Sequence, residues 1–265
     1  MCLLTLSLKE LLMAVLNLSF AACGFMGIYQ LGVLGAFLRH GQKLLQAVQA
    51  CAGASAGALV ATVLVTAPDK VERCKEFTCR LASEVRSQKL GAVTPGYDFM
   101  LALRDGIEDI LPPNAHQIAG DRLHISITHS RTRRNCMVSH FPSREDLIKV
   151  LLASSFVPVY AGIKAVEYQS QSWIDGGLSD SLPILPVGRT ITVSPFTGSQ
   201  DICPPRIGRA TFPLKLANMD VDFSTDNIKR LNQALFPPAL SRMKMIGQEG
   251  FDDAVRFLKK ENWFL

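Results

Sequence analysis

The chain has 265 residues, of which 48% are hydrophobic and 19% are charged, and its formal net charge is +5. This composition excludes an intrinsically disordered chain, and the length suits one large domain with a sizeable core. The mild positive charge is compatible with anionic surfaces such as phospholipid headgroups, but no run of Lys and Arg alternates with aromatic residues, so we expect no nucleic-acid binding.

The seven cysteines are scattered along the chain, and no two of them form a CxxC pair. An odd number of cysteines at irregular spacing argues against a disulfide framework and against a zinc site. We therefore expect free thiols, no bound metal and a reducing, intracellular compartment.

An uncharged run extends from Leu11 to Leu38 and is long enough to be considered as a membrane span or a secretory signal. Polar residues and four glycines interrupt the run, and the segment before its apolar core ends in Lys9 and Glu10 rather than opening with a cationic stretch. We favour a buried strand followed by a helix, and we keep the signal and the span as alternatives.

Hydrophobic periodicity predicts strands and helices that alternate along the chain, with a glycine loop between the first strand and the first helix. Strands are expected at 17–22, 47–53, 122–130, 135–141, 164–168, 171–174 and 190–195. Helices are expected at 28–40, 56–66, 68–88, 97–111, 143–155, 224–236 and 239–262. This alternation indicates one domain of the α/β class with a mostly parallel central sheet.

The segment "CAGASAG" places Ser55 between a predicted strand and a predicted helix. Gly53 and Gly57 flank it in the pattern G-x-S-x-G, which is typical of a nucleophile elbow. Larger side chains at the two glycines would collide in so tight a turn, and the N-terminus of the following helix favours a negatively charged oxygen. Close packing of a helix is the alternative explanation for this run of small residues.

The glycine loop "CGFMG" lies at a similar junction between a strand and a helix. An oxyanion hole needs backbone N–H donors from such a second loop. Its donors would come from Gly24, Phe25, Met26 and Gly27. A dinucleotide-binding fingerprint is the rival interpretation, but Ala22 replaces its first glycine and no acidic residue lies near 42–48.

No histidine follows residue 140, so none lies where an ordinary α/β-hydrolase triad would place its base. Asp175 instead follows the short strand 171–174 and precedes Gly176 and Gly177. A carboxylate at hydrogen-bond distance could take the serine proton directly. A hairpin turn is the alternative role for this Asp-Gly pair, and an upstream histidine stays open as the base.

In the order of "CGFMG", "GASAG" and "DGG", the chain resembles the patatin-like phospholipase family. The segments "SREDLIKVLLASSFVPVYAG" and "ILPVGRT" are similar to the animal branch of this family, which includes adipose triglyceride lipase and adiponutrin. Members are lipid acyl hydrolases with a Ser–Asp dyad, no catalytic histidine and a glycine-rich oxyanion loop. The resemblance therefore implies a three-layer α/β fold with a mostly parallel sheet.

The resemblance implies Ser55 as the nucleophile, Asp175 as its base and the glycine loop as the oxyanion hole. It further implies an N-terminal extension at 1–16, a lipid acyl hydrolase domain at 17–265, and no cofactor. The implied substrates are triacylglycerols, phospholipids or retinyl esters at a membrane or lipid-droplet surface, with possible acyl transfer to acylglycerol or retinol. Protein partners are not indicated. A lipid-binding regulatory protein with weak turnover and a small-molecule esterase with a conventional triad are the alternatives.

Overall fold

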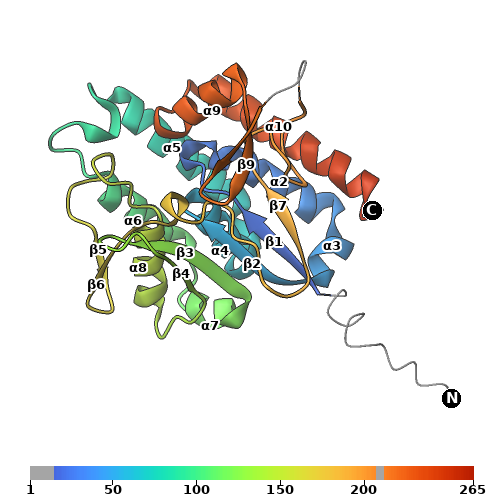
Figure 1. Ribbon diagram of the computed structural model, residues 1–265, viewed down its shortest axis with the longest axis horizontal. Helices are drawn as coiled ribbons and strands as arrows, with labels where there is room; N and C mark the ends of the chain where they lie inside the picture. Colours follow the sequence, from blue (N-terminus) through green and yellow to red (C-terminus); the bar gives the residue numbers. More distant parts are fainter. Residues whose placement is uncertain (1–14, 207–211) are drawn as a thin grey trace.

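The computed structural model describes residues 15–206 and 212–265, which form an α/β fold around one central sheet (Figure 1). Of the expected N-terminal extension, residues 1–14 lie outside the described residues. The strand order is β5-β6-β3-β2-β1-β7, and β4 also pairs with β3. The strands are β1 (Leu16–Phe20), β2 (Val48–Ala54), β3 (Leu123–His129), β4 (Asn135–Val138), β5 (Val166–Tyr168), β6 (Gln171–Asp175) and β7 (Arg189–Val193).

Strands β3, β2, β1 and β7 are parallel neighbours, which confirms the expected parallel sheet at its centre. Strands β4, β5 and β6 differ from this parallel arrangement and add an antiparallel end. Two short connections explain part of this difference, because the turn 130–134 joins β3 to β4 while Gln169 and Ser170, both with positive φ, join β5 to β6. Connections this short form antiparallel hairpins.

The helices pack as an inner and an outer set. Helices α4 and α8 contact the central strands and α2 lies beside α4, while α5, α6 and α10 pack against this inner set. Their bounds are α2 (Gly27–His40), α3 (Gln42–Ala47), α4 (Ala56–Thr66), α5 (Val71–Ser87), α6 (Phe99–Ile110), α7 (Ala115–Ala119), α8 (Arg144–Ser154), α9 (Thr225–Leu235) and α10 (Leu240–Lys260). Short 3-10 helices are η1 (Gly24–Met26), η2 (Pro68–Lys70), η3 (Gly91–Val93), η4 (Gly120–Arg122) and η5 (Gly176–Leu178).

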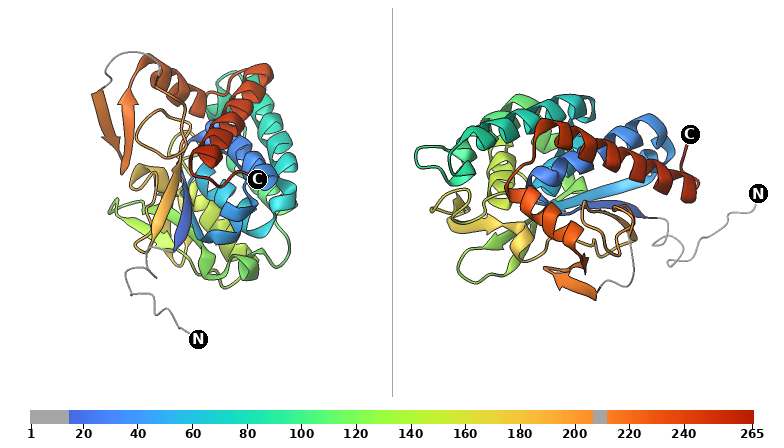
Figure 2. Two further views of the ribbon diagram at one scale, coloured as in Figure 1. Left: turned by 90° about the vertical axis from the view of Figure 1, so that its right-hand side faces the viewer. Right: turned by 90° about the horizontal axis from the view of Figure 1, so that it is seen from above.

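A second sheet of two strands, β8 (Phe212–Leu216) and β9 (Met219–Phe223), forms an antiparallel hairpin apart from the central sheet. Figure 2 shows α5 and α10 on one side of β1 and β7 and this hairpin on the other. Helix α9 follows the hairpin directly and contacts η1. The C-terminal part of the chain therefore returns to the loop that follows β1.

The uncharged run folds as a strand and a helix over its described part, 15–38, as expected. Helix α2 is buried on nearly every side because α4 and α10 enclose it. Two glycines allow the close crossing of α2 and α10, since a Cβ at Gly32 would overlap the backbone of Gly247 and one at Gly250 would overlap the carbonyl oxygen of Tyr29. Within residues 15–206 and 212–265, no helix has the length and apolarity needed to cross a membrane.

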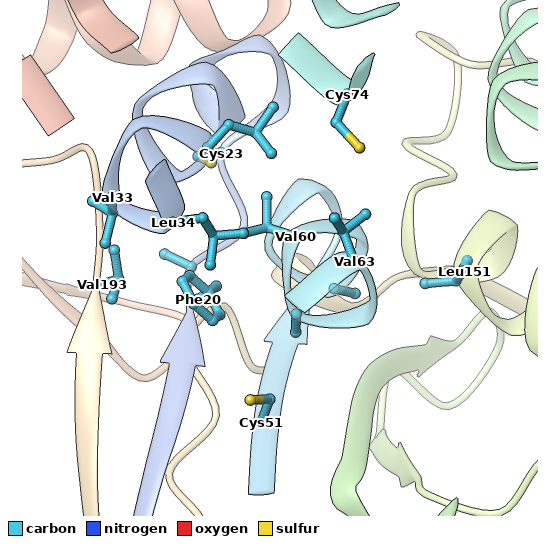
Figure 3. Close-up of a cluster of buried hydrophobic side chains, with 14 of the residues drawn as sticks. Phe20, Cys23, Val33, Leu34, Cys51, Val60, Val63, Cys74, Leu151 and Val193 are labelled. Carbon is cyan, nitrogen blue, oxygen red and sulfur yellow. The ribbon is translucent and has the colours of Figure 1, made fainter. Parts of the chain in front are cut away.

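The core between the sheet and the inner helices is built from aliphatic and aromatic side chains (Figure 3). Phe20 of β1 is fully buried, and Leu34 of α2 and Val60 of α4 lie around it. Burying side chains of this size stabilises the fold by roughly 1.5–3 kcal/mol each. This packing holds α4 against β1, while α4 also contacts β2, so the turn that joins β2 to α4 is held in place.

Candidate active site

Ser55 forms the tight turn between β2, which ends at Ala54, and α4, which begins at Ala56. Its backbone has φ 54° and ψ −127°, a conformation that non-glycine residues adopt only under strain. The flanking glycines are required here, because a Cβ at Gly57 would overlap the carbonyl oxygen of Phe20 and one at Gly53 would overlap the backbone of Gly57. The expected strand–turn–helix arrangement is therefore present.

Ser154 holds this turn in place, although nothing in its sequence context marks it. The Ser55 N–H donates to the Ser154 hydroxyl at 2.8 Å, and that hydroxyl donates to the carbonyl oxygen of Ser126 at 2.7 Å. Ser154 thus ties the strained residue at the end of β2 to the adjacent strand β3. A serine in the last turn of a helix gives no local signal of such a role.

Asp175 is the last residue of β6, and the register of the sheet brings it to the same level as Ser55. Ala54 pairs with Ser126 across β2 and β3, while Asp175 pairs with Ile127 across β6 and β3. Ser55 and Asp175 therefore flank Ile127 from opposite sides, and the Ser55 side chain lies close enough to lower the pKa of the Asp175 carboxyl. The glycines after Asp175 fit this close packing, because a Cβ at Gly176 would overlap the carbonyl oxygen of Ser126.

The carboxylate of Asp175 is buried, with only 4% of the residue exposed. Burial raises the pKa of Asp175 from 3.8 to about 6, while the nearby Ser55 side chain and the hydrogen bond from the Gly177 N–H act in the opposite direction. The Gly177 N–H lies 2.7 Å from Oδ1 and orients the carboxylate. Gly177 also packs against Ala22, where a Cβ on the glycine would come within 2.5 Å of the alanine Cβ.

The glycine loop forms η1 at the junction of β1 and α2, with φ +50° at Gly24. The Met26 N–H donates to the carbonyl oxygen of Cys23, and the Gly27 N–H donates to the carbonyl oxygens of Gly24 and Phe25. Met26 and Gly27, two of the four expected oxyanion donors, thus already use their N–H groups within the loop. In this described part of the chain, the N–H groups of Gly24 and Phe25 have no backbone acceptor. Gly24 packs closely under α9, because a Cβ there would overlap the carbonyl oxygen of Ala234.

Ser55 and η1 line one common cavity of about 140 Å³. The lining is mainly apolar and comes from α4, α5, α6 and α9, with Leu59, Phe77, Leu103 and Leu235 among its side chains. The hydroxyl of Thr62 also lines the cavity, but it donates to the carbonyl oxygen of Ala58 within its own helix. The cavity therefore suits an apolar chain whose polar end lies at Ser55.

The five histidines lie within the described ranges, and none of them lines this cavity. His129 packs edge-on against Trp173 at 5.3 Å, and its Nδ1 accepts from the N–H of Thr132 at 3.1 Å. His40 stacks on Phe264 at 4.7 Å. The geometry therefore does not bring a histidine base to Ser55, whereas it does bring a carboxylate.

The known proteins that this chain resembles all point to one family. The family model "Patatin-like phospholipase" matches residues 18–187. Patatin-like phospholipase domain-containing protein 4 of Homo sapiens is 61% identical over 249 residues, which are 94% of this chain and 98% of the relative. Patatin-like phospholipase domain-containing protein 2 of Homo sapiens is 37% identical over 92% of this chain, but this match spans only 48% of the longer relative.

A third relative, 1-acylglycerol-3-phosphate O-acyltransferase Pnpla3 of Mus musculus, is 34% identical over 92% of this chain and 59% of its own length. The resemblance drawn from the three glycine-containing motifs is thus confirmed. The family comprises lipid hydrolases and transacylases. The chain belongs to the patatin-like phospholipase family.

Proposed function

We propose that the chain is a serine lipid acyl hydrolase with Ser55 as its nucleophile and Asp175 as its general base. The position of Ser55 beside the buried carboxylate of Asp175 carries this proposal, because it gives a strained, cavity-lining hydroxyl a proton acceptor. A pKa of about 6 leaves the carboxylate mainly ionised at neutral pH, as a base requires.

In the first step, the Ser55 oxygen attacks the ester carbonyl carbon and its proton moves to the Asp175 carboxylate. The negative charge on the carbonyl oxygen is stabilised by the N–H groups of Gly24 and Phe25 and by the N-terminus of α4. When the ester C–O bond breaks, Asp175 returns the proton to the leaving alcohol, and the acyl group stays on Ser55.

In the second step, water attacks the acyl-enzyme and gives its proton to Asp175, which returns it to Ser55 as the fatty acid leaves. A lipid alcohol in place of water yields a transacylated lipid by the same proton movements. Apart from the substrate and the water or lipid alcohol, every group that these steps use belongs to the chain itself, so the proposed reaction needs no cofactor.

The mainly apolar cavity supports lipid esters as substrates, with the acyl chain lying along α4 and α5. Triacylglycerols, phospholipids and retinyl esters share this chemistry, and acylglycerol or retinol would act as acyl acceptors. We assign the activity to a domain spanning 17–265. We expect the protein in the cytoplasm, bound peripherally to lipid droplets or membranes.

A lipid turnover assay tests the proposal directly. Purified wild-type protein and Ser55→Ala are incubated separately with emulsified triolein, phosphatidylcholine vesicles and dispersed retinyl palmitate, and released fatty acid is quantified by mass spectrometry. We expect release from at least one substrate by the wild type and none above background by Ser55→Ala. Lipid binding without turnover by the wild type would favour the regulatory alternative, and equal turnover by both proteins would contradict the assignment of Ser55.

A further inference from the structure

The segment between α8 and β5 presents two strongly exposed aliphatic side chains. Val159 is 78% exposed and Ile163 is 99% exposed. They lie in a turn closed by hydrogen bonds of 2.8 Å from the Val159 N–H to Gly162 and from the Ala161 N–H to Val157. Both aliphatic side chains therefore point into water from an ordered backbone. Because they are not buried, they contribute little to the stability of the fold.

Val159 also has φ +73°, which places a β-branched residue in the left-handed region. Few β-branched residues adopt this conformation, because the branched side chain crowds the backbone there. Asn or Gly would fit such a turn with less strain. Val159 is therefore unfavourable for stability in two ways, because its φ is positive and its aliphatic side chain is exposed. Strained residues of this kind tend to occur at functional sites such as ligand-binding surfaces.

The same turn borders the proposed active site. Val157 and Tyr160 line the cavity that contains Ser55. The Tyr160 hydroxyl donates to the carbonyl oxygen of Leu235 on α9 at 2.6 Å, and its ring packs edge-on against Phe99 of α6 at 5.6 Å. The turn, the start of α6 and the end of α9 thus meet at the end of the cavity where η1 lies.

Exposed apolar side chains also occur on or next to these two helices. We call the set the apolar rim. It consists of Val159, Ile163, Leu101 of α6, Leu231 of α9 and Phe236, which follows α9. Leu101, Leu231 and Phe236 are each 54% exposed. The turn, α6 and α9 all line the cavity through other residues, so these exposed apolar groups belong to elements that surround it.

We propose that the apolar rim docks on the phospholipid surface from which the proposed acyl hydrolase draws its substrate, an inference that rests on the proposed function. A protein seated on the rim would cover the end of the cavity beside Ser55, whereas hydrocarbon both buries the aliphatic groups and supplies an ester. Lys164 follows Ile163 and its side chain is 85% exposed, with Glu167 at 3.7 Å as a loose, exposed partner. An ammonium group directly beside an inserting aliphatic group suits the phosphate layer of such a surface.

Flotation of the full chain with phosphatidylcholine vesicles tests the docking surface without requiring turnover. The double variant Val159→Asn/Ile163→Ser removes two exposed aliphatic groups and gives position 159 a residue that tolerates positive φ. We expect vesicle partitioning to fall about tenfold or more, while the melting temperature stays the same or rises. Phe212→Ser is the matched control, because Phe212 on β8 is also 78% exposed and does not line the cavity. We expect this control to partition like the wild type.

The proposal is wrong if the wild type does not float with the vesicles, if the double variant floats as well as the wild type, or if Phe212→Ser loses as much binding. A wild-type dimer in solution that the double variant converts to monomers, with vesicle binding unchanged, would show that the rim is a protein interface instead. Should the double variant unfold, Val159→Gly, which also relieves the positive φ, is measured in its place. Repeating the flotation with Ser55→Ala separates the two claims, since docking should persist in a protein that cannot form an acyl-enzyme.

Discussion

Ser55 and Asp175 lie on opposite sides of Ile127 at the end of β3, where the Ser55 side chain lowers the pKa of the Asp175 carboxyl. One residue belongs to a strained turn after a central parallel strand, and the other ends a strand at the antiparallel end of the sheet. Their meeting depends on the register of two strand pairs, because a one-residue slip of β6 would turn the Asp175 side chain to the other face. The pair is therefore a product of the whole sheet rather than of either motif alone.

Replacement of Ser55 separates catalysis from backbone strain. Ser55→Ala and Ser55→Gly should both abolish ester hydrolysis, and loss of a serine nucleophile can reduce the rate on the order of 10⁶-fold. Ser55→Gly should in addition unfold at a higher temperature than Ser55→Ala, because glycine relieves the strain at φ 54° by roughly 1–3 kcal/mol. Thermal unfolding followed by circular dichroism measures the difference, and equal melting temperatures would argue against a strained elbow.

The pH dependence of activity should report Asp175. Because burial raises the pKa of this carboxyl to about 6, activity should fall as the pH drops through this region and the base becomes protonated. An ordinary histidine titrates near 6.5, so the position of the limb alone does not distinguish the two bases. The distinction comes from Asp175→Asn, whose residual hydrolysis should lack this acid limb. A limb near pH 6 that survives in the variant would identify a different base.

Asp175→Asn should also change stability in a pH-dependent way. The pKa is raised on folding, so the native state binds more protons than the unfolded state between about pH 4 and pH 6, and the stability of the wild type falls as the pH rises through this range. A shift from 3.8 to about 6 corresponds to a cost on the order of 3 kcal/mol above pH 6. The asparagine avoids this cost and keeps an oxygen for the Gly177 N–H. Urea unfolding at pH 4 and pH 7 should show the variant gaining stability over the wild type only at pH 7. The same gain at both pH values would mean that the carboxylate is not the cause.

Two neighbouring buried serines provide a matched pair for testing the support of the elbow. Ser154→Ala removes the acceptor of the Ser55 N–H and should destabilise the fold by about 1–3 kcal/mol, because that N–H is left unsatisfied. The hydroxyl of Ser155 has no hydrogen-bond partner among residues 15–206 and 212–265, so Ser155→Ala should be neutral or slightly stabilising. Chemical denaturation of both variants measures the contrast. Similar losses in both would show that the hydrogen bond from Ser55 contributes little.

Much of the fold follows from local sequence signals. The helix expected at 56–66 coincides with α4, and the strand expected at 47–53 lies within one residue of β2 at each end. These segments are apolar, and their boundaries are marked by the small residues around Ser55 and by Pro68. The motif containing Ser55 could be predicted for the same reason, because the flanking glycines reflect the collision that larger side chains would cause.

Other elements depend on contacts that no local pattern reveals. The β8–β9 hairpin was missed because its turn uses Ala217 and Asn218, both with positive φ, where an Asn-Gly pair would have been the usual signal. Helices α3 and α7 have six and five residues, too short for a clear helical period. Ser154 was missed because its role arises only when α8 packs against β3 beside the turn at Ser55. Asp175 could be suggested from the sequence as a base for Ser55, but only the family resemblance favoured this pairing over a hairpin turn, since sequence separation hides the strand register.

The rate at which a fluorophosphonate probe acylates the purified full chain tests the Ser55–Asp175 pair most directly. Peptide mapping locates the adduct, and intact-mass spectrometry follows its formation in the wild type, Ser55→Ala and Asp175→Asn. We expect one adduct on Ser55 of the wild type, none on Ser55→Ala, and labelling slowed by at least about 10²-fold in folded Asp175→Asn, the lower range for loss of a general base. Labelling of Asp175→Asn at the wild-type rate, or an adduct on a residue other than Ser55, would contradict the account.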